Sequence, residues 1–326
     1  MFQDFTSPFK LRSRGIMGMN QRNHSYISRY NDRSKYPLVD DKLKTKIIAE
    51  KAGATTPALI GVIRSQAEVK TIHNMVKSWP GFVIKPAQGS GGKGILVVTE
   101  HKDGVYTKPS GATINEEDVE RHISNALAGL FSLGGKNDVA VVENLIKFDD
   151  CFDGFSYEGV PDVRIIVFQG YPVMAMMRLS TSASDGKANL HQGAVGVGID
   201  IATGKAVRAV QFDRPVTHHP DTGKELALLT VPHWKRLLTL ASSAYEMTTL
   251  GYMGTDMVLD REEGPMVLEL NARPGLAIQI ANGCGILPRL KHIESLGKPD
   301  PFNYPTPEQR VEYAAKMFSH QNHTTL

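Results

Sequence analysis

The chain has 326 residues, and its 37 lysines and arginines nearly balance its 34 aspartates and glutamates, which gives a formal charge of +3. Hydrophobic residues make up 41% of the chain and charged residues 22%, proportions that exclude disorder over most of its length. The most apolar stretches, such as 164–178, are bounded by charge and are shorter than the roughly 20 residues of a membrane span. We therefore expect one large domain or two lobes with a substantial core.

The charge is unevenly distributed, because residues 1–35 contain seven Lys/Arg and two Asp and the rest of the chain sums to −2. This segment lacks the apolar core of a secretory signal. Its Arg- and Ser-rich composition leaves open a transit peptide or a nucleic-acid-binding arm, although no nucleic-acid motif accompanies it. We favour an ordered arm, residues 1–39, that packs on the main body. The two cysteines, Cys151 and Cys284, fit no metal spacing and indicate a reduced, cytoplasmic protein.

The first half of the chain mixes predicted helices and strands. Asp40 and Asp41 are suited to cap a helix over 42–52, which Gly53 would end. The hydrophobic pattern then predicts a strand over 57–65, a helix over 66–79, strands over 81–86 and 95–100, a helix over 115–131 and a strand over 138–146.

The second half is dominated by predicted hairpins. Alternating patterns around short turns predict hairpins over 162–181, 193–212 and 254–271, the first with Gln169-Gly170 at its turn. Helices are expected over 232–251 and from about 276 to 296. The polar end of the chain, 319–326, is expected to be a mobile tail.

The glycine-rich segment 87–94 is the first feature that indicates a ligand. Gly89, Gly91 and Gly94 match G-x-G-x-x-G, but a strand follows them instead of the helix that a dinucleotide-binding fold requires. The Walker A spacing and the other protein-kinase motifs are also absent. Glycine N–H groups can approach a triphosphate closely, and Lys85 and Lys93 would add charge. A phosphate-covering hairpin is therefore predicted, with a simple turn as the alternative.

A cluster of oxygen-bearing side chains lies on the hairpin 254–271. Glu269 and Asn271 are two residues apart and share one face of their strand, and Asp256 lies on the partner strand. Two carboxylates and an amide oxygen are ligands that suit Mg²⁺. The alternative is the ordinary polar face of a half-buried hairpin.

Five motifs in order resemble the ATP-grasp superfamily over roughly 36–290. They are DDKLKTKIIAEKAG, GFVIKPAQGSGGKGI, VVENLI, DVRI…MMR…NLHQGA and GTDMVLD…MVLELNARPGL. More narrowly, NLHQGA after the DVR hairpin resembles RimK-type α-L-glutamate ligases. The segment GMNQRN…YPLVDDK is similar to sugar-transfer-associated ATP-grasp proteins.

The resemblance implies an α+β ATP-grasp fold, in which two lobes hold ATP between them. The lobes would comprise 40–146, with the glycine lid, and 147–318, with the metal site. The nucleotide phosphates would meet Lys42 and Lys85. The lid would comprise Gly89, Gly91, Gly92, Lys93 and Gly94. The adenine would meet the side chain of Glu143 and the backbone of Asn144 and Leu145.

The same resemblance implies a catalytic centre on the second lobe. Two Mg²⁺, or Mn²⁺ in their place, would bind Asp256, Glu269 and Asn271. The candidate catalytic residues, facing the γ-phosphate and the acyl acceptor, are Arg164, Arg178 and Asn189. His191 and Arg273 lie in the same motifs without an assigned role. Only about 40 residues precede Lys42, where ATP-grasp ligases commonly have a full domain that helps to bind the second substrate.

These features predict an ATP- and Mg²⁺-dependent carboxylate–amine ligase that forms an acyl phosphate and then an amide. The partners expected are a small carboxylate and an amine or peptide, with no nucleic acid and no membrane span. Whether glutamate is added, and the oligomeric state, stay open. The alternatives are a non-catalytic ATP-binding regulator and a phosphotransferase that stops at phosphoryl transfer.

Overall fold

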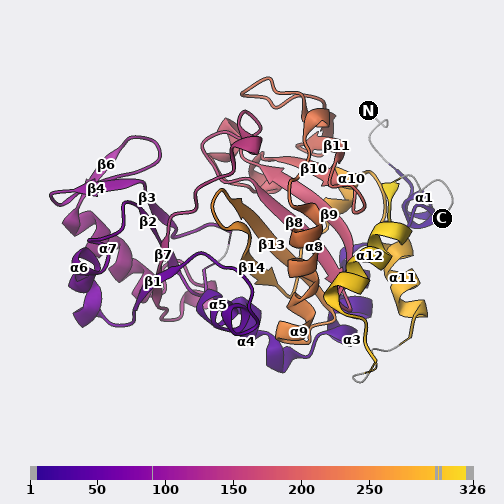
Figure 1. Cartoon of the computed structure of the whole chain (residues 1–326), viewed down its shortest axis with the longest axis horizontal. Coiled ribbons are helices and arrows are strands. Elements are labelled where there is room, and N and C mark those ends of the chain that lie inside the picture. The colour runs from indigo at the N-terminus through magenta and orange to yellow at the C-terminus, as the bar shows by residue number, and fades with distance from the viewer. Residues whose placement is uncertain (1–5, 90, 298–299, 301–302, 321–326) are drawn as a thin grey trace. The chain divides into compact units, whose positions relative to one another are not determined.

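The computed structural model describes residues 6–89, 91–297, 300 and 303–320 (Figure 1). The chain divides into two compact units, one formed by Asp40–Lys147 and the other by Met1–Val39 together with Phe148–Leu326. Both units mix helices and strands, which confirms the α+β class. Ser90 of the predicted lid and residues 321–326 of the predicted mobile tail lie outside the described residues.

The smaller unit is built on an antiparallel sheet packed against helices. Within its described residues the strand order is β1 (Leu59–Ile63), β7 (Ala140–Asn144), β2 (Phe82–Pro86) and β3 (Leu96–Val98). Its helices are α5 (Lys42–Lys51), α6 (Ile72–Met75) and α7 (Glu116–Leu127). The core between sheet and helices is apolar and includes Phe82, Ile84, Ile123 and Val142. Burial of these side chains is what holds the sheet and α7 together.

A second, small sheet in this unit was missed by the sequence patterns. It consists of β4 (Glu100–Lys102), β5 (Val105–Thr107) and β6 (Thr113–Asn115). Each strand has three residues, too few for alternation to be recognised, and the predicted strand 95–100 divides into β3 and β4. The predicted helix 66–79 is also shorter, with a 3-10 turn over Gln66–Thr71 followed by α6.

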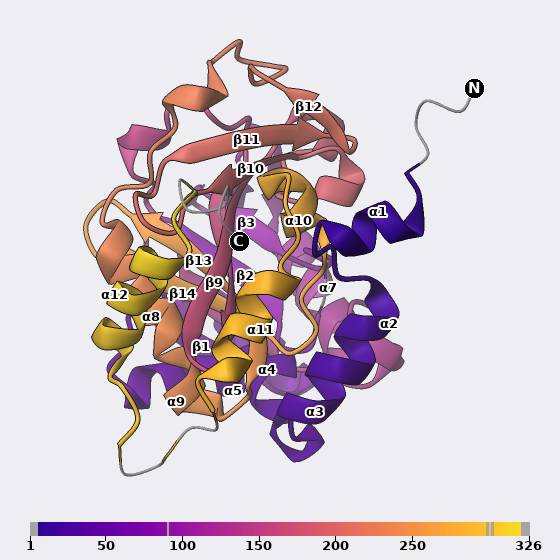
Figure 2. The ribbon, with the colours of Figure 1, turned by 90° about the vertical axis from the view of Figure 1, so that its right-hand side faces the viewer.

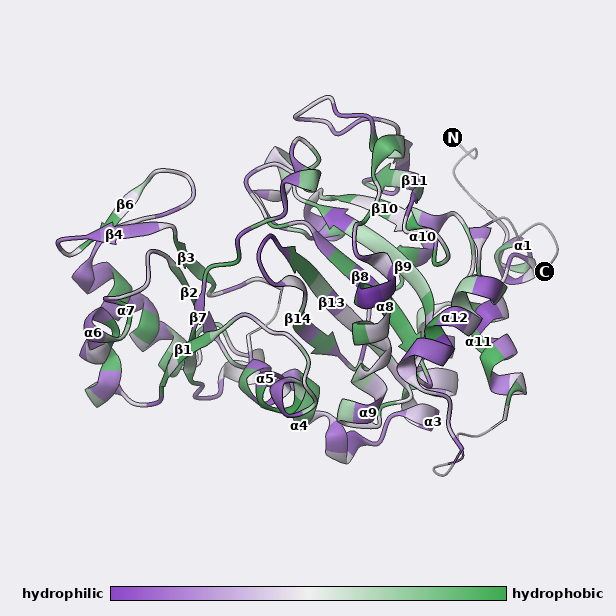
Figure 3. Ribbon diagram, in the orientation of Figure 1, coloured by the Kyte–Doolittle hydropathy of each residue, from purple (hydrophilic) through white to green (hydrophobic). Residues whose placement is uncertain are grey.

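The larger unit contains an antiparallel sheet that includes all three predicted hairpins. Across its described residues the order is β12 (Arg214–Val216), β11 (Ala206–Gln211), β10 (Val195–Ile199), β9 (Tyr171–Leu179), β8 (Asp162–Phe168), β13 (Tyr252–Asp260) and β14 (Gly264–Asn271). Gln169 and Gly170 both have positive φ, as a two-residue hairpin turn requires. Figure 3 shows β8 and β9 largely in the hydrophobic colour, and their residues are almost all buried.

Helices cover both faces of this larger sheet (Figure 2). On one face lie α8 (Trp234–Ser242) and α12 (Pro307–Met317). On the other lie α10 (Ala277–Asn282), α11 (Leu287–Ser295) and the N-terminal arm. The arm contains α1 (Pro8–Ser13), α2 (Met19–Gln21), a π-helical turn (Arg22–Ile27) and α3 (Ser28–Tyr30), and α4 (Pro37–Asp40) follows.

The arm is an integral part of the larger unit. Met17, Tyr26 and Ile27 are buried, and the rings of Tyr26 and Tyr30 pack edge-on against Phe168. The described part of the arm thus packs on the larger unit, as predicted, and most of it is helical.

Two predicted long helices are interrupted. The segment 232–251 forms α8 and α9 (Ala244–Thr248), and the segment 276–296 forms α10 and α11. Gly283 ends α10 with a φ of 67°, and left-handed backbone cannot continue a helix. None of the described helices is long and apolar enough to cross a membrane.

The contact of the arm with the start of α11 predicts a sensitive position at Gly285. A Cβ there would lie 2.0 Å from the backbone of Gly15, so Gly285→Ala should lower the free energy of unfolding by about 1–3 kcal/mol. The matched control is Gly18→Ala, because a Cβ on Gly18 meets nothing within 4 Å. Urea unfolding measures both, and equal stability of the two variants would contradict the described packing.

Candidate functional site

The predicted site residues form two sets, one in each unit. In the smaller unit, Lys85 on β2 and Glu143 on β7 are buried together with Lys46 of α5. Nζ of Lys46 lies 3.0 Å from one carboxylate oxygen of Glu143, and Nζ of Lys85 lies 2.5 Å from the other. Two ammonium groups thus share one carboxylate, and the cluster carries a net charge of +1.

Burial and charge act in opposite directions in this lysine–glutamate cluster. Burial would raise the pKa of Glu143, but Lys85 and Lys46 lower it overall. Burial lowers the pKa of Lys46 in spite of the attraction of Glu143. The cluster depends on mutual pairing, since a buried charge without a partner is strongly unfavourable.

This arrangement gives Glu143 a structural role, and its contact with adenine stays a prediction. Both of its oxygens accept from lysines, so Glu143 positions Lys85. To bind an adenine amino group, Glu143 would use the second lone pair of one carboxylate oxygen or give up one lysine contact. Lys46 was missed by the sequence analysis. The available signal was its position one helical turn after Lys42, on the same face of α5.

Lys42 contacts the beginning of the glycine-rich loop. It is the first residue of α5, which Asp41 caps by accepting from the N–H groups of Leu43 and Lys44. The backbone N–H of Lys42 donates to the carbonyl of Ala87, and its Nζ donates to the carbonyl of Gly89 at 2.6 Å. The helix and the loop are thereby fastened together.

The loop is anchored at its ends and open at its tip. Asp138 accepts from the N–H of Gln88 at 2.9 Å, and the ring of Phe131 lies 2.4 Å from where a Cβ of Gly94 would be. Gly91 and Gly92 have positive φ and nothing within 4 Å of a Cβ. Lys93 beside them is exposed. Asp138 is a second residue that sequence reasoning missed.

In the larger unit, strand register brings distant charged residues onto one face of the sheet. Arg178 on β9 is directly opposite Asp162 on β8, Arg164 on β8 is opposite Asp256 on β13, and Asp256 is opposite Glu269 on β14. Residues directly opposite in antiparallel strands share a face. The sheet thus carries a continuous row of two arginines and three carboxylates, with a formal charge of −1.

Asp256 is the centre of this charged row. Arg164 donates to both of its oxygens, at 2.7 and 2.5 Å, and Arg178 donates to one of them at 2.8 Å. Arg178 also donates to both oxygens of Asp162. Burial favours the neutral form of Asp256, but the two arginines outweigh burial and lower its pKa. At Asp162 burial outweighs the attraction of Arg178 and raises the pKa to about 6.

The three residues predicted to hold metal can be tested against this geometry. Asp256 and Glu269 are cross-strand neighbours, Asn271 lies two residues beyond Glu269, and all three offer the hard oxygens that Mg²⁺ prefers. Oδ1 of Asp256 accepts from Arg164, and Oδ1 of Asn271 accepts from the N–H of Arg273. Each of these oxygens has a second lone pair, so the set fits a divalent cation. The described residues contain no group of three or more His, Cys, Asp or Glu side chains suited to a metal.

Asn189 has a structural role in the described fold. Its side chain caps a 3-10 turn over Leu190–Gln192 by accepting from the N–H of His191, which is itself exposed. Leu190 lies 2.6 Å from where a Cβ of Gly196 would be. Gly196 is the cross-strand partner of Arg178, so the turn packs on the face that carries the charged row.

Arg273 continues the segment after β14. Its guanidinium lies 5.2 Å from the centre of the Tyr36 ring, a cation–π contact with the end of the arm. The structure thus places Arg273 between the end of β14 and the end of the arm.

The chain matches one protein family and several distantly related solved structures. The model of the sugar-transfer associated ATP-grasp family matches residues 21–295. Curated proteins yield no significant match. The family is one of the two resemblances in the sequence, and the narrower RimK-type resemblance is not confirmed.

Several solved structures resemble the chain at low sequence identity. D-alanyl-alanine synthetase A of Vibrio cholerae is 12% identical with a TM-score of 0.47, over 88% of this chain and 67% of that one. The ATP-grasp ligase PsnB with a precursor variant, Mg and ADP is 14% identical, with a TM-score of 0.43, over 82% and 61%. The L-amino acid ligase of Bacillus licheniformis is 14% identical, with a TM-score of 0.42, over 76% and 43%. The chain thus spans less than two thirds of the last two proteins. TM-scores below 0.5 add nothing to the family assignment.

The lysine–glutamate cluster predicts unequal effects of two isosteric changes. Glu143→Gln leaves two buried ammonium groups without a counter-charge and should cost about 3–5 kcal/mol of unfolding free energy. Lys46→Met leaves the neutral pair of Lys85 and Glu143 and should cost clearly less. Urea unfolding at pH 7 measures both, and a larger loss for Lys46→Met would contradict the assigned geometry.

The effect of Glu143→Gln on the free energy of unfolding should depend on pH. Because the folded state lowers the pKa of Glu143, its stabilising charge is present above the unfolded value of about 4.3 and is lost as the pH falls through the folded value. The stability difference between wild type and Glu143→Gln should therefore shrink on acidification. A difference that grows below pH 4 would contradict the direction of the shift.

Proposed function

The chain belongs to the sugar-transfer associated ATP-grasp family, and on that premise we propose that it is an ATP- and Mg²⁺-dependent ligase joining a carboxylate to an amine. The observation that supports this most is the opposite charge of the two clusters. The cluster of Lys46, Lys85 and Glu143 has one excess positive charge. The row around Asp256 has one excess negative charge. Nucleotide phosphate is complementary in charge to the first cluster, and Mg²⁺ is complementary in charge to the second.

The proposed reaction has two steps. The substrate carboxylate attacks the γ-phosphorus of ATP, the bond to the bridging oxygen breaks, and an acyl phosphate and ADP form. The amine then attacks the acyl carbon, loses a proton, and releases phosphate as the amide bond forms. Each step moves negative charge onto oxygen atoms, which fixed cations stabilise most effectively when they are already oriented.

The chain's own cations supply that orientation. Arg164 donates two hydrogen bonds to Asp256, and Arg178 donates two to Asp162 and one to Asp256, so carboxylates fix both guanidinium planes. In this proposal they neutralise charge on the transferred phosphate and on the acyl oxygen. Lys85, fixed by Glu143, and Lys42, at the foot of the glycine loop, bind the nucleotide phosphates.

Asp256, Glu269 and Asn271 are the residues that would hold Mg²⁺, which when bound offsets phosphate charge. Arg164 keeps Asp256 ionised, since it lowers the pKa of that carboxyl in spite of burial. The open tip of the glycine loop, Gly91 and Gly92, can approach phosphates with its N–H groups. Cys151 is exposed, but partial desolvation of its thiol and the neighbouring Asp149 raise the pKa to about 12, so it fits no nucleophile role.

The proposed substrates are a small carboxylate and an amine or peptide. Glutamate or another amino acid as the added group follows the RimK-type resemblance alone. A phosphotransferase and a non-catalytic ATP-binding protein use the same nucleotide residues. The release of ADP distinguishes these functions when pools of carboxylates and amines are supplied singly and together. A ligase requires both pools. ATP binding without turnover under any combination would contradict the proposal that the protein is an enzyme.

Lys85 should be needed for ATP affinity and Lys46 should not. Lys85→Met and Lys46→Met each remove one ammonium group and each leave one lysine paired with Glu143, so the two variants are matched in charge. Loss of a charge-assisted phosphate contact should weaken ATP binding about tenfold or more in Lys85→Met only. Titration calorimetry measures this, and equal affinities of the two variants would contradict the role of Lys85.

Glu269 should be needed for turnover. Glu269→Gln removes a charge from the proposed cation set and should reduce ADP release at least a hundredfold, with partial recovery at higher Mg²⁺. Glu263→Gln, in the exposed turn of the same hairpin, is the control and should retain wild-type turnover. Near-normal activity of Glu269→Gln would exclude it from the metal site.

A further inference from the structure

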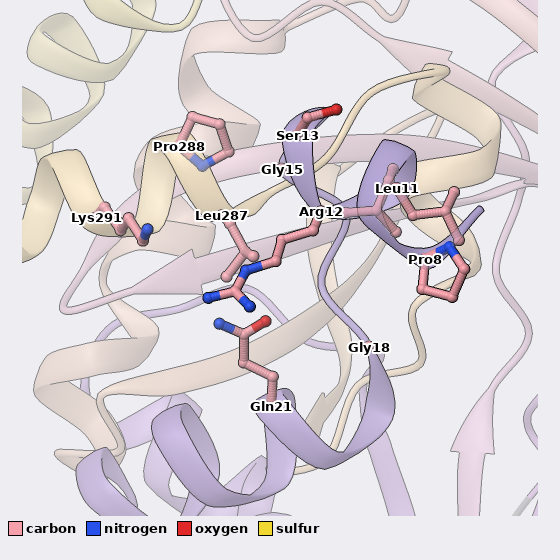
Figure 4. Close-up of a pocket in the computed structure, with 11 residues that line it drawn as sticks. Pro8, Leu11, Arg12, Ser13, Gly15, Gly18, Gln21, Leu287, Pro288 and Lys291 are labelled. Carbon is pink, nitrogen blue, oxygen red and sulfur yellow. The ribbon is translucent and has the colours of Figure 1, made fainter. Parts of the chain in front are cut away.

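A pocket of about 770 Å³ lies between the arm and α11, within the larger unit (Figure 4). Its volume is in the range of small-molecule sites. Part of its wall is apolar and consists of Leu11, Ile16, Leu287 and Pro288. It shares no residue with the charged row or the lysine–glutamate cluster, so its role is independent of the proposed ligase reaction.

The walls of this arm pocket are fixed by close backbone packing. Gln279, which is 3% exposed, accepts from the N–H of Met17 at 2.8 Å and donates to its carbonyl at 3.0 Å. The N–H of Leu287 donates to the carbonyl of Gly15, and a Cβ on Gly15 would lie 2.5 Å from Pro288. The pocket is thus a preformed feature of the packed arm.

Two cations and an amide face this opening. Figure 4 shows the guanidinium of Arg12 and the amide of Gln21 pointing toward one another, with Lys291 extending from α11 toward the same space. Among the described residues, neither Arg12 nor Lys291 has a side-chain hydrogen bond or ion pair. None of the described residues that line the pocket is acidic.

We propose that the arm pocket binds an anionic amphiphile, a molecule in which a phosphate group is attached to an apolar chain. Arg12, Lys291 and the amide of Gln21 hold the phosphate, since guanidinium and ammonium groups donate strongly to its oxygens. The apolar chain covers Leu11 and Leu287, whose contact removes hydrocarbon from water. Neither part alone uses the whole pocket.

Such a molecule can reach the pocket from solution or from a lipid surface. The arm also exposes Phe9, at 84%, and Met19, at 64%, and neither residue lines the pocket. These two side chains would meet a bilayer but not a monomeric ligand. They therefore provide a way to distinguish the two sources.

The test uses octyl phosphate below its micelle concentration, with inorganic phosphate and octyl glucoside as probes of each half. Calorimetry on the full chain should show octyl phosphate binding at least tenfold more tightly than either. Arg12→Ala and Lys291→Ala should each weaken it about tenfold. Arg14→Ala is the matched control, because Arg14 lies on the same arm outside the pocket. Leu11→Ser should weaken binding and Phe9→Ser should not.

Vesicles of phosphatidylglycerol and phosphatidylcholine test the second source by co-sedimentation. Capture that Arg12→Ala abolishes and Arg14→Ala preserves would support binding of a lipid phosphate in the pocket. Capture lost equally in Arg12→Ala and Arg14→Ala would instead reveal a diffuse basic surface and overturn the pocket. Octyl phosphate binding no tighter than inorganic phosphate, or unchanged in the Arg12→Ala and Lys291→Ala double variant, would also overturn it.

Discussion

One carboxylate shared by two cations is the interaction on which both candidate site regions depend. Asp256 is 3% exposed and binds Arg164 and Arg178, and Glu143, also 3% exposed, binds Lys46 and Lys85. Removing an ion from water is so costly that such groups persist only when partners are positioned closely. The sheets supply that positioning, because the strand register determines which side chains lie directly opposite one another. Ligand chemistry and fold are therefore set by the same contacts.

The charged row was largely predictable and its internal bonding was not. Alternation in the hairpin placed Glu269 and Asn271 on one face, and the register of β13 and β14 confirms it. However, Arg164 and Asp256 are separated by 92 positions in the chain. Pairing of β8 with β13 is determined by the packing of the whole sheet, which no local pattern contains. The sequence analysis thus identified Arg164, Arg178, Asp256 and Glu269, missed Asp162, and did not show that arginines donate to Asp256.

The helix predictions failed where backbone contacts outweigh local pattern. The pattern of 276–296 is helical, but Gly283 adopts a left-handed conformation and Gly285 closely approaches Gly15 of the arm. A continuous helix would place side chains in that contact, and the arm could not pack as it does. In contrast, α12 carried a readable signal, since Thr306 and Gln309 form a capping box around Pro307. No helix was predicted over Pro307–Met317, although this capping signal is present in the sequence.

Asn31 of the arm joins two segments of the larger unit. Its side chain donates to the carbonyls of Tyr252 and Ala272 and accepts from the N–H of Tyr252. It thereby joins the start of β13, the strand of Asp256, to the residue that follows Asn271. Arg22, one position after the pocket residue Gln21, donates to the carbonyl of Pro274. A displacement of the arm would therefore break hydrogen bonds to the segments that flank Asp256 and Asn271, so the packing of the arm helps to fix the position of both strands.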